Sequence, residues 1–152
     1  MRWMGKDPAR DLDEAHEAIE GFSKLRQLPS PGIRWGLHRQ GEHALIGSCG
    51  FFNRDARWRK CVLGYELDRR AWRTGYMREA LVAALNWAFT RTDLHRIEAI
   101  VHPDNAASLR LLRSLRFEQE GRLRQCGYWV GQRHDTLMLS LLKSDCEETV
   151  SS

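Results

Sequence analysis

The sequence predicts one domain of the α/β (α+β) class, in which helices flank a mixed, mostly antiparallel sheet. Three observations support this class. Three short strand-like runs follow one another, and the first has a hydrophobic residue at every second position, which is the pattern of a strand that buries one face. Longer segments with hydrophobic residues three and four apart then alternate with further strand-like runs, which indicates helices between strands. The length of 152 residues fits a single domain with one core.

The first half of the chain predicts one helix followed by three strands. Residues 11–27 have helical spacing, and the proline-containing segment 28–32 ends this helix. Strands are predicted at Ile33–His38, at residues 44–52 and at Lys60–Leu67. Because the turns between these strands are short, we expect an antiparallel meander.

The second half of the chain alternates helices and strands. The strand–helix–strand unit within residues 60–102 predicts a parallel pair of strands, because such a crossover returns the chain in the same direction. The predicted helices span residues 75–90 and 105–115, the predicted strands span residues 96–102, Glu118–Trp129 and 135–142, and residues beyond Ser144 are expected to be frayed.

Composition indicates which partners the chain is expected to have among membranes, metals and nucleic acids. No apolar run approaches the roughly 20 residues that span a bilayer, and the charged N-terminus lacks the apolar core of a signal peptide, so we expect a cytoplasmic protein without a membrane partner. Cys49, Cys61, Cys126 and Cys146 are too widely spaced for a zinc site, which predicts reduced thiols and no metal. The net charge of +4 suits nucleic acid, a ribosome or a phosphorylated cofactor, but no basic block is long enough to indicate nucleic acid.

A glycine between arginines marks the start of the helix predicted at residue 75. Arg70, Arg73 and Arg78 flank Gly75 on both sides. The N-terminus of a helix presents unpaired N–H groups and a positive dipole, and glycine lets a phosphate approach the backbone closely. The segment is therefore a candidate pyrophosphate cradle. A plain turn before a helix is the alternative interpretation.

Several linked motifs share one order and spacing. They are LGYEL at 63–67, WRTGYMREA at 72–80, PDNAAS at 103–108, LLRSLRF at 111–117, EGRLR at 120–124 and HD at 134–135. Together they resemble the GNAT superfamily of N-acetyltransferases, within its branch of ribosomal-protein N-terminal acetyltransferases of the RimJ and RimL type. The resemblance covers roughly residues 33–142. It implies the GNAT fold, in which two central parallel strands splay apart.

The resemblance also implies acetyl-CoA as the cosubstrate. The strand that ends at Leu67 would diverge from the strand at residues 96–102, and the pantetheine arm would enter there and pair with the backbone near Leu67. Asn105 and Ser108 would lie beside the pantetheine and its sulfur. The pyrophosphate would lie on the backbone amides of Arg73, Thr74, Gly75, Tyr76, Met77 and Arg78.

The activity implied by the resemblance is acetyl transfer to a primary amine by direct attack in a ternary complex. The acceptor is a protein N-terminus, such as that of a ribosomal protein, or a small amine. The amine must lose a proton, because only its neutral form attacks, and the leaving thiolate needs stabilisation. Glu66 is the candidate general base, with a solvent-facing strand residue as the alternative. Ser108 is the candidate that stabilises the sulfur, with a helix-starting role as the alternative.

Three positions depart from the family pattern. Met77 stands where a small residue is usual, which predicts a tighter fit around the phosphate. Arg116 stands where glycine is usual before Phe117, which predicts a strain of about 1 kcal/mol if the turn requires a positive φ. Leu112 stands where many GNAT enzymes carry a tyrosine acid, so no tyrosine acid is assumed at this position.

Two other functions fit the same residues. A catalytically weak acyl-CoA-binding regulatory module would keep the Gly75 region without needing Glu66. An RNA- or ribosome-binding protein would account for the positive charge, and its affinity would fall steeply with salt. Release of the CoA thiol in the presence of amines distinguishes the enzyme from both.

Few residues precede the first predicted helix. Residues 1–10 are too few for the strand and short helix with which family members usually begin, so we expect Ile33–His38 to be the edge of the sheet. An edge strand exposes unpaired N–H and C=O groups. Either residues 1–4 pair with this edge as a short strand, or a second chain covers it in a homodimer, or the start codon is misassigned. We slightly favour the homodimer.

Overall fold

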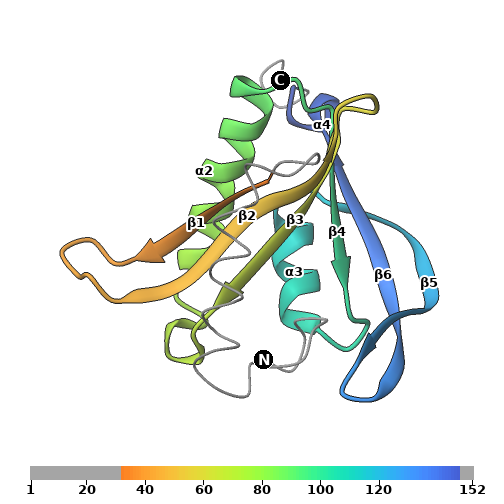
Figure 1. Ribbon diagram of the computed structural model, residues 1–152. Helices are drawn as coiled ribbons and strands as arrows, with labels where there is room; N and C mark the ends of the chain where they lie inside the picture. Colours follow the sequence, from red (N-terminus) through yellow and green to blue (C-terminus); the bar gives the residue numbers. More distant parts are fainter. Residues whose placement is uncertain (1–31, 148–152) are drawn as a thin grey trace.

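The computed structural model describes residues 32–147, which form a six-stranded sheet with α2 and α3 behind it in the view of Figure 1. The strands are β1 (Ile33–His38), β2 (Leu45–Asp55), β3 (Lys60–Leu67), β4 (Arg96–Val101), β5 (Glu118–Trp129) and β6 (Gln132–Leu142). The helices are the 3-10 turn η2 (Arg69–Ala71), α2 (Tyr76–Arg91), α3 (Ala106–Ser114) and α4 (Lys143–Glu147). No helix in this part of the chain is long and apolar enough to cross a membrane. The helix predicted at residues 11–27 lies outside the described residues.

The predicted meander is confirmed. β1 pairs with β2 and β2 pairs with β3, both antiparallel. The β1–β2 turn closes with a hydrogen bond from Glu42 N to Arg39 O of 3.0 Å. β2 continues to Asp55 rather than ending at residue 52, because the strand resumes pairing with Lys60 after an irregularity beyond Phe52. A turn was expected directly after residue 52, and pairing with β3 extends the strand through polar residues instead.

The central strands β3 and β4 are parallel, as predicted, but pair over a short stretch. The pairs are Lys60 with Arg96, Cys61 with Ile97 and Val62 with Glu98. Both strands continue beyond these pairs, β3 to Leu67 and β4 to Val101, and Figure 1 shows them diverging. We call residues 63–67 of β3 and 99–101 of β4 the splayed ends. β4 continues the sheet on its other side through antiparallel pairing with β6.

One hydrophobic core joins the sheet to α2 and α3. Side chains alternate between the two faces of a strand, so one residue in two points into this core. α2 contributes buried residues three and four apart, as the sequence predicted, among them Leu81, which is fully buried. Truncation of such a leucine to alanine costs roughly 2–5 kcal/mol. The main core residues from the sheet are Cys49, Phe51, Cys61, Leu63, Ile97, Ala99, Val101, Leu137, Leu139 and Leu141.

The C-terminal hairpin is tighter than predicted. β6 begins at Gln132 rather than at residue 135, because Val130 and Gly131 take positive φ values of 51° and 68° and turn the chain within two residues. Residues beyond Ser144 were expected to be frayed, which is wrong up to residue 147, because α4 forms there. Asp145 Oδ2 accepts a hydrogen bond of 2.8 Å from Leu142 N and fixes this turn.

The end of α3 requires a positive φ at Arg116, the position where glycine is usual in the family. Arg116 has a φ of 69°, in the left-handed region that favours glycine. Phe117 N donates to Leu112 O at 3.0 Å, and Arg116 N donates to Arg113 O at 3.0 Å, so the helix ends in a closed cap. The strain expected of an arginine here, about 1 kcal/mol, is therefore built into the fold.

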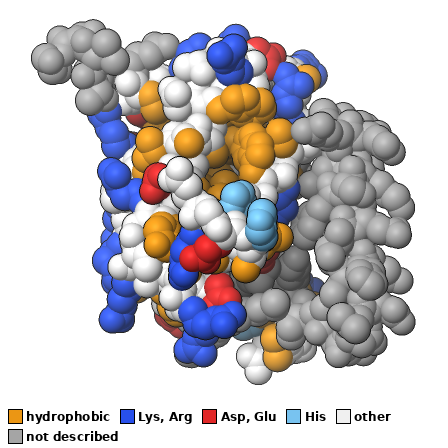
Figure 2. Space-filling model, turned by 90° about the vertical axis from the view of Figure 1, so that its left-hand side faces the viewer, with side chains coloured by type: hydrophobic (Ala, Val, Ile, Leu, Met, Phe, Trp, Pro, Cys, Tyr) orange, Lys and Arg blue, Asp and Glu red, His pale blue; other side chains and the backbone are white. Residues whose placement is uncertain are grey.

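β1 is the edge strand of the described sheet, as expected. Its Trp35 ring packs edge-on against Trp87 of α2 at 5.2 Å and against Phe51 of β2 at 5.9 Å between ring centroids. Trp87 remains 38% exposed. Figure 2, a view from the β1 side, shows hydrophobic side chains gathered on this face and basic side chains along its margin. The edge is thus both unpaired within residues 32–147 and partly apolar.

Candidate active site

The N-terminus of α2 is not capped by a side chain. Its N-cap is Gly75, with a φ of 82°. The first bond of the helix runs from Glu79 N to Gly75 O at 3.0 Å, so the amides of Tyr76, Met77 and Arg78 have no acceptor within the helix. Apart from chain neighbours, no described atom lies within 4 Å of where a Cβ on Gly75 would stand. Open space before free amides suits an anion such as a phosphate.

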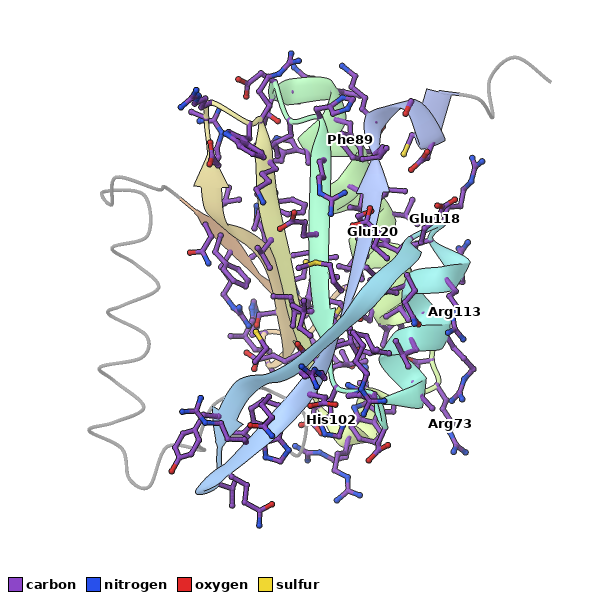
Figure 3. The ribbon with its side chains drawn as sticks, turned by 90° about the vertical axis from the view of Figure 1, so that its right-hand side faces the viewer. Arg73, Phe89, His102, Arg113, Glu118 and Glu120 are labelled. Carbon is purple, nitrogen blue, oxygen red and sulfur yellow. The ribbon has the colours of Figure 1, made fainter. Side chains whose placement is uncertain are left out.

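The three arginines around this turn differ in their partners. Arg70 forms an ion pair with Asp68 at 3.0 Å and lowers the pKa of that carboxyl group. Arg73 and Arg78 are exposed and form no ion pair within the described residues, and Figure 3 shows Arg73 projecting outward. Arg73 also has a left-handed φ of 62°, as Gly75 does, and such turns are one way of building an anion-binding nest. Arg73 and Arg78 are therefore the better candidates to meet a phosphate.

The end of β3 is tied to the same turn. Trp72 Nε1 donates a hydrogen bond of 2.9 Å to Leu67 O. A carbonyl oxygen has two lone pairs, so Leu67 can still accept from a pantetheine amide. Thr74 Oγ1 donates to Ala71 O and fixes the turn. The Met77 side chain is buried in the core, and its backbone amide is one of the three at the start of α2.

α3, unlike α2, is capped. Asn105 is its N-cap rather than its first helical residue, and Asn105 Oδ1 accepts a hydrogen bond of 3.2 Å from Ser108 N. Ser108 Oγ lies 2.8 Å from the hydroxyl of Tyr65, which belongs to the splayed end of β3. Burial raises the pKa of Tyr65 to about 12, although the hydrogen bond with Ser108 opposes this shift. The pair places two hydroxyl groups between β3 and α3.

Glu66 points to the face of the sheet opposite Tyr65, as alternation requires. Its Oε1 accepts hydrogen bonds of 2.8 Å from Ser48 Oγ and 2.9 Å from Arg34 Nη2, and 36% of its side chain is exposed. The structure thus brings Ser108 to Tyr65 and Glu66 to Arg34, and shows no contact between Glu66 and Ser108. Tyr65, Arg34 and Ser48 were not among the predicted site residues. Alternation along β3 could have placed Tyr65, whereas the other two depend on strand register.

An aromatic cluster follows the splayed end of β4. The rings of Trp129 and His134 stack at 3.9 Å, and His102 lies 5.5 Å from His134. Asp104 N donates a hydrogen bond of 3.1 Å to His102 Nδ1. Figure 3 shows His102 at the end of the molecule where the β5–β6 hairpin projects. The cluster fixes this hairpin beside the carboxyl end of β4.

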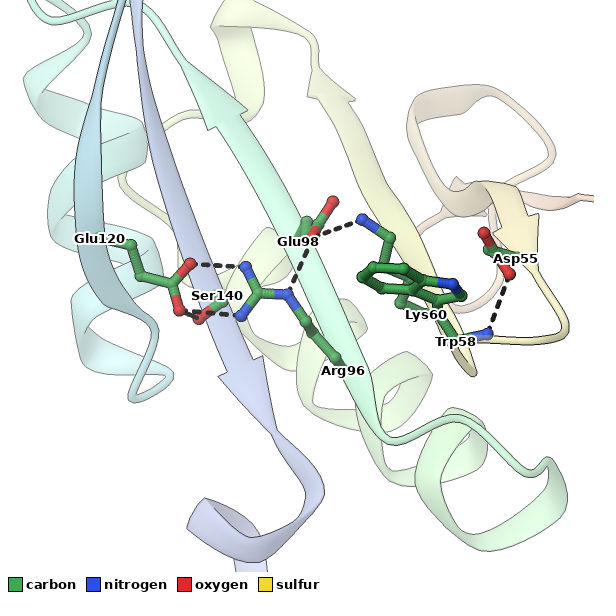
Figure 4. Close-up of polar contacts among 7 residues, drawn as sticks. All are labelled: Asp55, Trp58, Lys60, Arg96, Glu98, Glu120 and Ser140. Atoms are coloured by element: carbon green, nitrogen blue, oxygen red, sulfur yellow. Dashed lines mark hydrogen bonds and ion pairs between the residues drawn. The ribbon is translucent and has the colours of Figure 1, made fainter.

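A cavity of about 440 Å³ lies at the other, paired end of β3 and β4, away from the splayed ends. Its charges are satisfied within the protein. Glu98 Oε1 accepts from Lys60 at 3.0 Å and from Arg96 at 2.8 Å, and Arg96 also pairs with Glu120 (Figure 4). Ser140 Oγ donates to Glu120 at 2.7 Å. We interpret this network as structural, because each charge already has a partner of opposite sign.

Comparison with known proteins identifies the family. The model of the acetyltransferase (GNAT) domain matches residues 1–118. The uncharacterized N-acetyltransferase YoaA of Bacillus subtilis is 36% identical over 142 residues, which are 93% of this chain and 80% of the relative. The ribosomal protein uS5-alanine N-acetyltransferase of Escherichia coli is 33% identical over 144 residues, which are 91% of this chain and 74% of that enzyme.

Solved structures agree with this result. RimL, the ribosomal L7/L12 α-N-protein acetyltransferase in complex with coenzyme A, has a TM-score of 0.78 and 25% identity, and the match covers 87% of this chain and 73% of RimL. A probable acetyltransferase has a TM-score of 0.80 and 26% identity, over 91% of this chain and 76% of that one. The match to the family model, the relatives above 30% identity and the splayed parallel pair together show that this chain belongs to the GNAT family of N-acetyltransferases.

Proposed function

We propose that the chain transfers the acetyl group of acetyl-CoA to a primary amine by direct attack within a ternary complex, and that a protein α-amino group is its preferred acceptor. The observation that carries this proposal is the uncapped start of α2 beside the splayed ends of β3 and β4. The uncapped start of α2 suits a pyrophosphate, and the gap between the splayed ends suits an extended pantetheine arm.

The residues available fit acetyl-CoA. The amides of Tyr76, Met77 and Arg78 face open space past Gly75, and Arg73 adds positive charge. The backbone of β3 past Val62 has lost its β4 partner, so its polar groups on that side can pair with the pantetheine amides. In this arrangement Ser108, at the start of α3, stands beside the sulfur.

Glu66 is proposed to accept the proton of the attacking amine, directly or through a water. Ser48 and Arg34 hold one of its carboxylate oxygens, which fixes the group in place. Since Glu66 faces away from the core, the amine would approach from that side of the sheet. An α-amino group has a pKa of about 7.7–8.0 and a lysine about 10.4, so more of the α-amine is already neutral near pH 7. The relative that acetylates the alanine of ribosomal protein uS5 supports the same acceptor class.

Ser108 is proposed to donate a hydrogen bond to the sulfur as the thiolate leaves. A thiol has a pKa of about 8.5, so a thiolate departs readily once it has one donor. The bond between carbon and sulfur breaks, its electron pair stays on sulfur, and the new bond joins the acetyl carbon to the amine nitrogen.

An acceptor screen tests the proposal. The purified chain is incubated with acetyl-CoA and a panel of peptides with free or blocked α-amines, lysine derivatives and polyamines, and thiol release is followed. We expect release that depends on the amine and is greatest with free α-amines. Tight acetyl-CoA binding without release for any amine would instead indicate the regulatory module.

A further inference from the structure

One hydrogen bond links β3 to α3 at the splayed ends. The hydroxyl of Tyr65 and Oγ of Ser108 are 2.8 Å apart, and either atom can be the donor. Tyr65 lies beyond Val62, the last residue of β3 that pairs with β4, and Ser108 lies in the first turn of α3. The contact is therefore made where the proposed function places the sulfur of acetyl-CoA.

The direction of this bond decides which hydrogen is left for a third group. Each hydroxyl has one hydrogen and can also accept. Burial raises the pKa of Tyr65 to about 12, so the phenol keeps its hydrogen at neutral pH. A partly buried donor is paired in most proteins, and Ser108 Oγ is the acceptor that the described residues give to Tyr65. When Tyr65 donates, the hydrogen of Ser108 is left for another acceptor.

Ser108 makes one hydrogen bond through its backbone and one through its side chain. Its N–H group donates to Asn105 Oδ1 at 3.2 Å, which fixes the backbone of the first turn, and its Oγ meets the phenol. Leu112, one turn further along α3, is fully buried in the core and offers no donor. Any hydroxyl that α3 presents near the sulfur must then come from Ser108, and its orientation depends on Tyr65.

We propose that Tyr65 is a positioning residue, whose hydroxyl donates to Ser108 Oγ and turns the hydrogen of that serine toward the sulfur of acetyl-CoA. This inference rests on the proposed function, because it requires Ser108 to face the sulfur. During transfer the carbon–sulfur bond breaks, and its electron pair stays on the sulfur that Ser108 stabilises. The proton of the amine leaves through Glu66, so neither hydroxyl is deprotonated.

The test removes one oxygen atom. Tyr65→Phe keeps the ring and its packing. We expect kcat at saturating acetyl-CoA to fall about tenfold, which corresponds to a free energy of about 1.4 kcal/mol. This energy lies within the range that one neutral hydrogen bond contributes. The KM for acetyl-CoA should stay within about twofold, because the bond matters when charge develops on sulfur. A merely structural role would lower the melting temperature and change KM as well.

A double-mutant cycle separates an effect through Ser108 from an independent one. The variants are Tyr65→Phe, Ser108→Ala and the double variant. If Tyr65 acts through Ser108, the double variant should be no slower than Ser108→Ala. Ser114→Ala is the matched control, since Ser114 lies on the same helix with its exposed hydroxyl bonded to Leu111 O at 2.7 Å, and it should keep wild-type kcat.

Each outcome is decisive. Full kcat in Tyr65→Phe, or a double variant slower than Ser108→Ala by the whole Tyr65→Phe factor, overturns the positioning role while leaving acetyl transfer intact. Full kcat in Ser108→Ala overturns it too, because the tyrosine then has no serine to act through. A wild-type chain that acetylates no amine contradicts the proposed function itself, and this result is distinct from an active wild type with an active Tyr65→Phe variant.

Discussion

Replacing Gly75 with valine tests the cosubstrate site. Gly75 has a φ of 82°, and the space around its missing Cβ is empty of described atoms to 4 Å. Valine would place a branched side chain in that space, in front of the free amides of α2. It would also adopt a backbone conformation that branched residues avoid. The substitution is therefore expected to act on both binding and stability.

The two effects differ in size and can be separated. A left-handed conformation costs an L-residue roughly 1–2 kcal/mol, which lowers the melting temperature of a chain of this length by about 2–8 °C. A hydrogen bond to a charged group contributes about 1.5–3 kcal/mol, so the loss of one amide–phosphate bond weakens acetyl-CoA binding at least about tenfold. Gly131→Val is the control, because Gly131 has a φ of 68° and equally open surroundings in the β5–β6 turn.

Calorimetry is the assay. We expect Gly75→Val to raise the Kd for acetyl-CoA at least about tenfold, and Gly131→Val to lower the melting temperature similarly without changing this Kd. S-acetylpantetheine, which keeps the thioester but lacks the pyrophosphate, should bind wild type and Gly75→Val alike. An unchanged acetyl-CoA Kd in Gly75→Val, or an equal loss with S-acetylpantetheine, would refute the pyrophosphate assignment.

Three further predictions follow from the site and the sheet. Glu66→Gln should lower kcat about 10²-fold or more with acetyl-CoA affinity unchanged, and full turnover at neutral pH would remove Glu66 from the mechanism. The pKa of Glu120 is lowered from 4.5 to about 2, mainly by its hydrogen bond with Arg96, so the stability it contributes is present above pH 4.5 and is lost as the pH falls toward 2. The melting temperature of wild type should thus drop more over this range than that of Glu120→Gln, and equal slopes would contradict the assignment. The edge at Ile33–His38, which has no further strand beside it within residues 32–147, predicts a homodimer in light scattering at low micromolar concentration. An active monomer with slow amide exchange along this strand would exclude the homodimer.

Most of the fold could be predicted because periodicity reports which face of an element is buried. The helices α2 and α3 differ from their predicted bounds by one residue at each end, and at their starts the reason is that Gly75 and Asn105 are caps rather than helical residues. The sequence could not place the end of β2 at Asp55 or the start of β6 at Gln132. Both bounds depend on pairing with a neighbouring strand. The residues near them are polar, so the sequence pattern alone predicts a turn at these positions.

The candidate site was predictable where it is local and not where it is long-range. The Gly75 turn and the start of α3 at Asn105 each lie within a single sequence motif, so their places in the fold could be inferred to within one residue. The contact of Tyr65 with Ser108 joins residues 43 positions apart, and that of Glu66 with Arg34 joins residues 32 apart. Such contacts depend on helix packing and strand register, which the sequence pattern does not specify.

The proposed direct transfer of the acetyl group from acetyl-CoA to an amine can be followed in a single-turnover experiment with an isotopically labelled acetyl group. Enzyme, labelled acetyl-CoA and a peptide with a free α-amine are mixed, stopped at intervals and measured by mass spectrometry. We predict labelled peptide and free CoA thiol in equal amounts at every time, with no label on the enzyme. Label that appears first on the protein, or thiol released without labelled peptide, would contradict direct transfer.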